Sequence, residues 1–135
     1  MDRETRRNIA LGAYEAFCAG DFDRLAELVR PDVVVRLDPA IAPSAELEFR
    51  GLDELRRLFS EVDHGWRVRA RACAFAEIDG TVAMLSKVEA GSVRPAAMLS
   101  ASVWQFEGGR IGSVDTYTDP EQIGRIKRRF GLALD

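Results

Sequence analysis

The spacing of the apolar residues changes after residue 62 of this chain, and the change limits the folds that the chain can adopt. Over most of the first 62 residues, apolar side chains recur every three or four positions, which is typical of helices that bury one side. From residue 67 they alternate with other side chains, which is typical of β-strands. Helices that come early and antiparallel strands that come late predict an α+β fold, with the helices on one face of the sheet.

End signals divide the helical part into segments. Gly20 is suited to end the first helix, because glycine adopts the left-handed conformation that often follows a helix. Asp21 or Asp23 can cap a short second helix, which Pro31 closes. The expected helices are residues 4–19, residues 23–29, a third that starts at Asp53, and a last that starts at Pro120 with Asp119 as its N-cap and Gln122 at the capping-box position.

The strand-like segments predict a curved sheet. The run VVVRLDP, residues 33–39, is an early strand, and residues 40–51 are expected to form a loop or a loose edge segment. Long strands that bend around N-terminal helices enclose a cone, and the mouth of such a cone is a natural small-molecule pocket. The four later strands are predicted at residues 67–75, 81–90, 95–106 and 111–118, with turns at Asp79-Gly80 and at EGGR.

Composition excludes several classes of protein. A chain of 135 residues suits one domain, and its net charge of −3 argues against a nucleic-acid partner. The sequence lacks a signal peptide and any apolar run long enough to cross a membrane, which predicts a cytoplasmic protein. The only histidine is His64, and Cys18 and Cys73 are expected to be buried free thiols, so no metal site is predicted. No cofactor is predicted either, because the chain has no Gly-rich phosphate loop or dinucleotide motif.

Both faces of the strand at residues 95–106 are rather apolar. One face carries Ser102 and Trp104, and the other carries Leu99 and Val103. A sheet with one covered face shows a cleaner alternation of apolar and polar residues. The second face is therefore expected to meet another subunit, which predicts a homodimer packed through the sheet.

Three segments of the sequence carry a resemblance to a known family. They are AYEAFCAGDFDRLAELVRPDVVV, FRGLDELRRLF and VWQFEGGRIGSVDTYTD, in this order. Together they resemble the SnoaL-like proteins of the nuclear-transport-factor-like superfamily, over nearly the whole chain. The resemblance implies a single domain at residues 1–135 with a cone-shaped α+β fold. It does not imply one activity, because the superfamily includes isomerases, polyketide cyclases, epoxide hydrolases and dehydratases.

The resemblance also implies where catalytic residues would lie. Ketosteroid isomerases are similar to this chain over the first helix and strand, and their general base is the aspartate of a strand-ending Asp-Pro, which stands here as Asp38-Pro39. Their oxyanion tyrosine would fall at Ala13, one residue before the tyrosine of this helix, and their second donor would fall at Ser102. The histidine and aspartate of SnoaL-type cyclases would fall at Ser102 and Thr116, so the cyclase pair is missing.

We expect Asp38 to be the catalytic base. A carboxylate beside an apolar wall has its charged form disfavoured, which makes it a better proton acceptor. Two other interpretations stay open. Arg36, two residues away on the same face of the strand, can neutralise Asp38 as an ion pair, or Asp38 can be a turn-forming residue before the loop.

The expected ligand contacts come from the first helix and the sheet. Ser102 and Thr116 should face the same interior as Trp104, where they can donate hydrogen bonds or simply fit a narrow cone. Asp115 should lie on the opposite face, unless a β-bulge turns it inward. The residues predicted to bind substrate are Tyr14, Phe17, Arg36, Ser102, Trp104 and Thr116.

These features predict a cofactor-independent enzyme of the isomerase, cyclase or dehydratase type that acts on a hydrophobic carbonyl compound. Asp38 would take a proton from the carbon beside the carbonyl, and a hydroxyl group would stabilise the oxyanion that develops. Two alternatives stay open. One is a non-catalytic binding module for a hydrophobic small molecule, and the other is a structural dimerisation domain with a filled cone.

Overall fold

The structure is a computed structural model, which describes residues 1–42, 46–63, 67–91 and 96–132. His64 lies outside the described residues. The helices are α1 (Arg3–Ala19), α2 (Phe22–Leu28), α3 (Gly51–Asp63) and α4 (Pro120–Phe130). The strands are β1 (Val29–Arg36), β2 (Glu48–Arg50), β3 (Arg67–Ile78), β4 (Thr81–Gly91), β5 (Ala96–Glu107) and β6 (Arg110–Tyr117).

The strands form one curved sheet in the order β2-β1-β6-β5-β4-β3. β3 to β6 pair antiparallel with their neighbours in sequence, which confirms the predicted meander and the α+β class. The sheet is mixed rather than purely antiparallel, because β1 lies parallel to β6. β1 also begins at Val29 instead of Val33. Pro31, which has no N–H to donate, fits inside β1 because the pairing with β6 is interrupted between Val29 and Val34.

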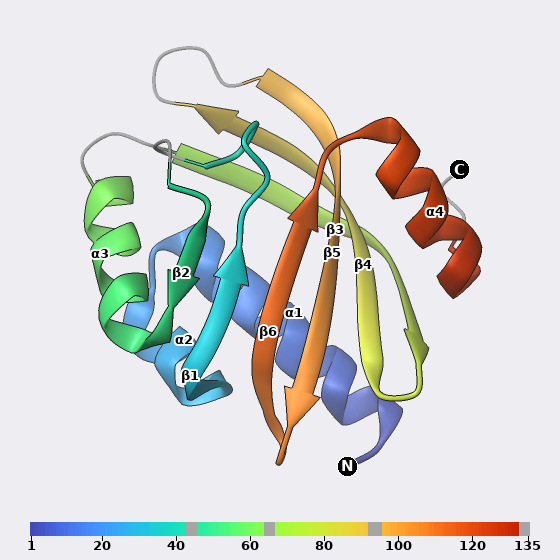
Figure 1. Ribbon diagram of the computed structural model, residues 1–135, viewed down its shortest axis with the longest axis horizontal. Coiled ribbons are helices and arrows are strands. Elements are labelled where there is room, and N and C mark those ends of the chain that lie inside the picture. The colour runs from blue at the N-terminus through green and yellow to red at the C-terminus, as the bar shows by residue number, and fades with distance from the viewer. Residues whose placement is uncertain (43–45, 64–66, 92–95, 133–135) are drawn as a thin grey trace.

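α1 packs along one face of the sheet, behind the strands in Figure 1. Asp2 caps its start by accepting a hydrogen bond from Thr5 N, and Gly20 ends it with a φ of 72°. Ala10, Ala13 and Ala16 are fully buried on the face turned to the sheet. Small side chains on this face let the helix axis come close to the strands.

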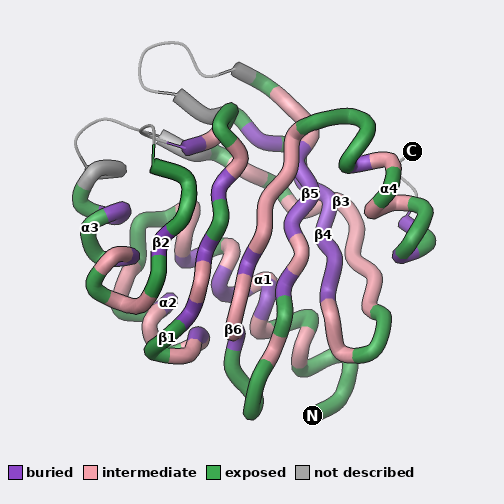
Figure 2. Tube along the Cα trace, viewed as in Figure 1, coloured by how far each residue is buried: buried purple, intermediate pink, exposed green. Residues whose placement is uncertain are grey.

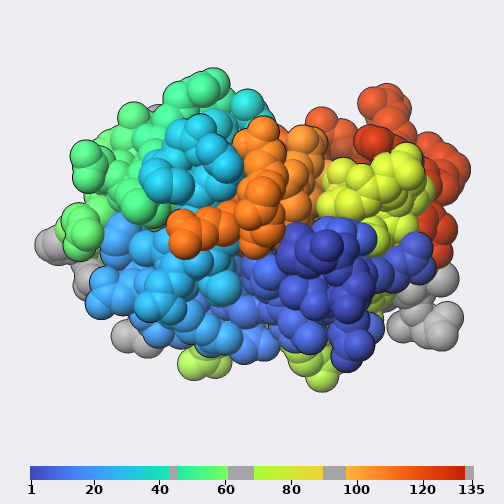
Figure 3. Space-filling view, turned by 90° about the horizontal axis from the view of Figure 1, so that it is seen from below, coloured from blue at the N-terminus to red at the C-terminus, as the bar shows by residue number. Residues whose placement is uncertain are grey.

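The start of α1 is held at the sheet edge by an ion pair with β3. Arg6 donates from Nε to Glu77 Oε1 at 2.6 Å and from Nη2 to Oε2 at 2.9 Å. The Glu77 side chain is only 7% exposed, and the hydrogen bonds from Arg6 hold the pKa of this carboxyl below its usual range. At the same end, Arg30 and Glu107 pair at 3.4 Å, and Figure 3 shows the orange turn between β5 and β6 lying against the blue N-terminal residues.

α4, at the right in Figure 1, packs against part of the other face of the sheet. Its Ile123 and Phe130 pack with Ala83, Leu85 and Ala101 of that face. Residues 82–86 of β4 are therefore buried on both faces, and they appear as a purple run in Figure 2. The apolar residues of this second face are therefore covered, at least in part, by α4 of the same chain. The homodimer inferred from that character stays a prediction.

Replacing Asp119 with alanine should lower the free energy of unfolding by about 1 kcal/mol. The Asp119 side chain caps α4 by accepting from Gln122 N at 3.0 Å, and alanine leaves this N–H without its partner. Asp119→Asn is the control, because asparagine keeps the acceptor oxygen and should retain most of the stability. Urea unfolding measures both variants. Equal losses in the two would show that the charge, and not the cap, stabilises the helix.

Candidate functional site

A cavity lies between α1 and the face of the sheet that α1 covers, with a volume of about 60 Å³. We call that face of the sheet the inner face and the opposite one the outer face. The lining side chains come from α1, α2, β1, the loop after β1, β4, β5 and β6, and none of the described residues that line the cavity is charged. Of the residues predicted to contact a ligand, those that line it are Tyr14, Phe17, Ser102, Trp104 and Thr116.

Aromatic side chains form one side of the cavity. The ring of Tyr14 meets that of Trp104 edge to face, with 6.3 Å between centroids. Burial raises the pKa of the Tyr14 phenol well above its usual range, so this hydroxyl stays protonated at neutral pH. The Ser86 hydroxyl opposes part of that rise in pKa, although no hydrogen bond of normal geometry joins the two side chains.

Ser102 and Thr116 lie opposite each other across β5 and β6 and face the cavity, as the alternation predicted. Their hydroxyl groups already have partners. Ser102 Oγ accepts a hydrogen bond from Trp104 Nε1 at 2.8 Å. Thr116 Oγ1 accepts from Asp38 N at 2.8 Å and donates to Arg36 O at 3.1 Å. These two hydroxyls therefore fix the cavity wall, and their role toward a ligand stays a prediction.

Asp38 follows β1 and is not among the described residues that line the cavity. Its Oδ1 accepts hydrogen bonds from Thr118 Oγ1 at 2.6 Å and from Ala40 N at 2.9 Å. Its Oδ2 accepts from Thr118 N at 3.0 Å. The carboxylate thus joins the loop after β1 to the residue that follows β6, as a turn-forming aspartate does. Its neighbour Leu37 and its partner Thr116 both line the cavity.

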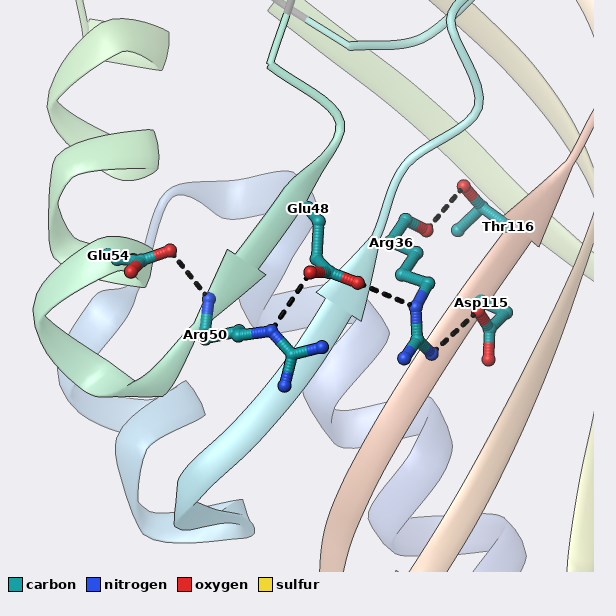
Figure 4. A network of polar contacts seen from close by, with 6 residues as sticks. All are labelled: Arg36, Glu48, Arg50, Glu54, Asp115 and Thr116. Atoms are coloured by element: carbon teal, nitrogen blue, oxygen red, sulfur yellow. Dashed lines mark hydrogen bonds and ion pairs between the residues drawn. The ribbon is translucent and has the colours of Figure 1, made fainter.

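Arg36 lies on the outer face, in the network drawn in Figure 4. It donates from Nε to Glu48 at 2.9 Å and from Nη1 to Asp115 at 3.1 Å, and its side chain is 46% exposed. Hydrogen bonds to Asp115 and Glu48 raise the pKa of the Arg36 guanidinium, and those from Arg50 and Arg36 lower the pKa of Glu48. Asp115 faces this network. The register shift of β5 and β6 falls between Gln105 and Phe106 and does not turn Asp115 inward.

Sequence reasoning missed several residues of the site. Leu37, Ile41 and Cys18 line the cavity, and Cys18 lies one helical turn after Tyr14. Thr118 holds both carboxylate oxygens of Asp38. The helical spacing of Cys18 relative to Tyr14 was visible in the sequence. The pairing of Thr118 with Asp38 was not, because it depends on β1 lying beside β6.

The fold and the cavity together define a class of protein. It is a small α+β domain whose curved sheet surrounds an apolar cavity. The chain belongs to the SnoaL-like domain family, which matches residues 10–114. A comparison with curated protein sequences found no match.

Solved structures share the fold at low sequence identity. An NTF2-like protein of unknown function from Burkholderia pseudomallei is 22% identical, with 93% of this chain and 97% of that chain covered and a TM-score of 0.75. TerC, co-crystallised with polyporic acid, is 15% identical, with 92% and 98% covered and a TM-score of 0.74. An LEH-like epoxide hydrolase from M. tuberculosis is 13% identical, with 94% and 92% covered and a TM-score of 0.72.

No helix in the described ranges is long and apolar enough to cross a membrane. Within the same ranges, His, Cys, Asp and Glu side chains form no group of three or more that could hold a metal ion.

Cys18 should make the fold sensitive to alkaline pH. Burial of the thiol, with a smaller effect of Glu15, raises its pKa from 9.0 to about 11. The folded protein then holds this proton more tightly than the unfolded chain does. The resulting stability is fully present below pH 9 and is lost as the pH rises toward 11.

Urea unfolding at pH 8 and pH 11 measures this loss. Cys18→Ala and Cys18→Ser should each lose less stability between the two pH values than the unmodified protein, by an amount on the order of 2 kcal/mol. The same loss in all three proteins would show that another group causes the alkaline sensitivity.

Proposed function

We propose that the protein binds an uncharged, largely apolar small molecule in the cavity between α1 and the sheet. The observation that carries the proposal is the lining of that cavity, in which the described residues are apolar apart from a few hydroxyl groups and the Cys18 thiol. Apolar walls with a few convergent polar groups are typical of small-molecule sites. An unpaired charge in such surroundings is disfavoured, so the preferred ligand is neutral.

The size of the cavity restricts how such a ligand enters. A volume of about 60 Å³ is well below that of pockets that enclose a drug-sized molecule, which is roughly 300 Å³ or more. Only a slender part of a ligand, such as a short alkyl or ketone end, fits while the side chains keep their present positions. TerC, which shares this fold, was co-crystallised with polyporic acid. That result concerns TerC alone, and it supports small-molecule binding within this fold.

Filling the cavity should prevent binding. Val114 of β6 lines it, and Val114→Phe places a larger side chain in the same space. The matched control is Val103→Phe, because Val103 lies on the neighbouring strand and packs with the residues on the outer face. The probe is 4-phenyl-2-butanone, followed by ligand-observed NMR. We expect Val114→Phe to weaken binding at least about tenfold, because the phenyl ring occupies the space that the ligand needs, and Val103→Phe to leave it within about twofold.

Thermal unfolding shows whether both variants fold. Equal binding by the two folded variants would locate the ligand outside the cavity. Absence of binding to the unmodified protein, with both this ketone and its hydrocarbon analogue butylbenzene, would refute the proposed function.

A second candidate function is proton abstraction by Asp38. The support for this reaction is the position of Asp38. Its sequence neighbour Leu37 and its hydrogen-bond partner Thr116 both line the cavity. In this reaction the Asp38 carboxylate removes a proton from the carbon beside a ketone. The C–H electron pair forms the enolate double bond, and the negative charge moves to the oxygen. The three hydrogen bonds that Asp38 already accepts make binding the better-supported function.

Proton abstraction can be detected without knowing the natural substrate. In D2O, an enzyme of this kind exchanges the protons beside the carbonyl of 4-phenyl-2-butanone for deuterium, which proton NMR follows. Asp38→Asn should abolish the catalysed exchange and leave ketone binding in place. Thr118→Val is the control, because it removes a hydroxyl partner and keeps the carboxylate. Exchange that persists in Asp38→Asn would exclude Asp38 as the base.

A further inference from the structure

A second hollow lies beside the cavity, between α1 and β3. It is a groove of about 560 Å³, lined by residues of α1 from Leu11 to Ala19 and by residues 69–72 of β3. We call it the α1–β3 groove. Glu15, Ala19 and Arg71 are exposed, so the rim of the groove is open to water.

The residues of β3 explain why this groove exists. Near the start of α1, the ion pair of Arg6 with Glu77 holds the helix on β3. Toward the end of α1, the residues that β3 turns to the inner face are Ala70 and Ala72, which pair with inner-face residues of β4. Their methyl groups are too short to fill the space beside the helix. The groove is therefore a consequence of small side chains on the edge strand.

The groove and the cavity have two lining residues in common, Tyr14 and Cys18. These residues lie one turn apart on α1, so their side chains form a single wall with the cavity on one side and the groove on the other. Tyr14 is fixed by the edge-to-face contact of its ring with Trp104. Cys18 has the smaller side chain of the two and is the thinner part of the wall.

The Cys18 thiol suits a wall between two apolar spaces. Burial raises its pKa to about 11, so the thiol is neutral at physiological pH. A neutral thiol behaves as a small hydrophobic group. An alkyl chain can therefore lie against Cys18 without leaving a charge unpaired.

We infer that Cys18 sets the length of the ligand, because it closes the cavity toward the α1–β3 groove. This inference rests on the proposed function and adds the class of ligand, a straight-chain neutral compound whose chain ends at Cys18. The cavity of about 60 Å³ admits only a slender chain. A smaller side chain at position 18 joins the two spaces, and a longer chain then continues into the groove.

Methyl ketones of increasing length, from 2-pentanone to 2-decanone, measure the space that a chain can use. Ligand-observed NMR, in competition with 4-phenyl-2-butanone, gives the affinity of each ketone. Each methylene group that enters the cavity should tighten binding roughly fourfold. In the unmodified protein this gain should stop where the chain meets Cys18. A gain that continues through 2-decanone would overturn the inference.

Cys18→Ala should extend the gain by about two or more methylene groups, each again worth roughly fourfold, because the chain passes into the groove. The matched control is Cys73→Ala. Cys73 lies where the register of β3 and β4 shifts, and it is not among the described residues that line either space. This control should keep the length limit of the unmodified protein. An extension of one methylene group alone would show a local enlargement of the cavity and overturn the inference.

Filling the groove tests the path of the longer chain. Ala72 lines the groove and not the cavity. Adding Ala72→Leu to Cys18→Ala should restore the original length limit, and thermal unfolding shows whether the double variant folds. Ala19→Phe, at an exposed position of the groove, takes the place of Ala72→Leu if it does not. A longer limit that persists with the groove filled would show another exit and overturn the inference.

An unchanged length limit in folded Cys18→Ala would also overturn the inference while leaving the proposed function intact. If neither the methyl ketones nor 4-phenyl-2-butanone bind the unmodified protein, the proposed function fails, and the role of Cys18 fails with it.

Discussion

The close approach of α1 to the sheet is the contact on which the cavity depends. Ala10, Ala13 and Ala16 are fully buried, and larger side chains at these positions would hold the helix away from the strands. Because the helix lies so near, Tyr14 meets Trp104 at its ring edge and the space left over is only about 60 Å³. The same packing brings the Tyr14 phenol to Ser86. The narrowness of the cavity therefore follows from the small side chains that α1 turns to the sheet.

The sheet separates charge from apolar surface. Arg36, Glu48 and Asp115 pair on the outer face, where water reaches them, while α4 covers the apolar part of that face. The described residues that line the cavity on the inner face carry no charge. Exposed ion pairs of this kind contribute little stability each. This separation favours binding of a neutral molecule over chemistry that needs a free charged group.

The spacing of the apolar residues and the residues that end helices were enough to predict most of the fold. Alternation placed Ser102, Trp104 and Thr116 on one face and Asp115 on the other, because the side-chain period of a strand is fixed by its geometry. The parallel pairing of β1 with β6 was not predictable in this way, since it joins segments far apart in sequence. For that reason two contacts could not be predicted, the pairing of Arg36 with Asp115 and the hydrogen bonds from Thr118 to the Asp38 carboxylate.

The same limit explains why the sequence pointed to Asp38 and not to Cys18. An Asp-Pro at a strand end is visible in a few letters, whereas a cysteine on the apolar side of a helix is ordinary until its surroundings are known. What distinguishes Cys18 is that it lines both the cavity and the α1–β3 groove, and that is a property of α1 and the sheet together. Asp38, by contrast, is not among the described residues that line the cavity, because the fold uses both of its carboxylate oxygens to join the loop after β1 to Thr118.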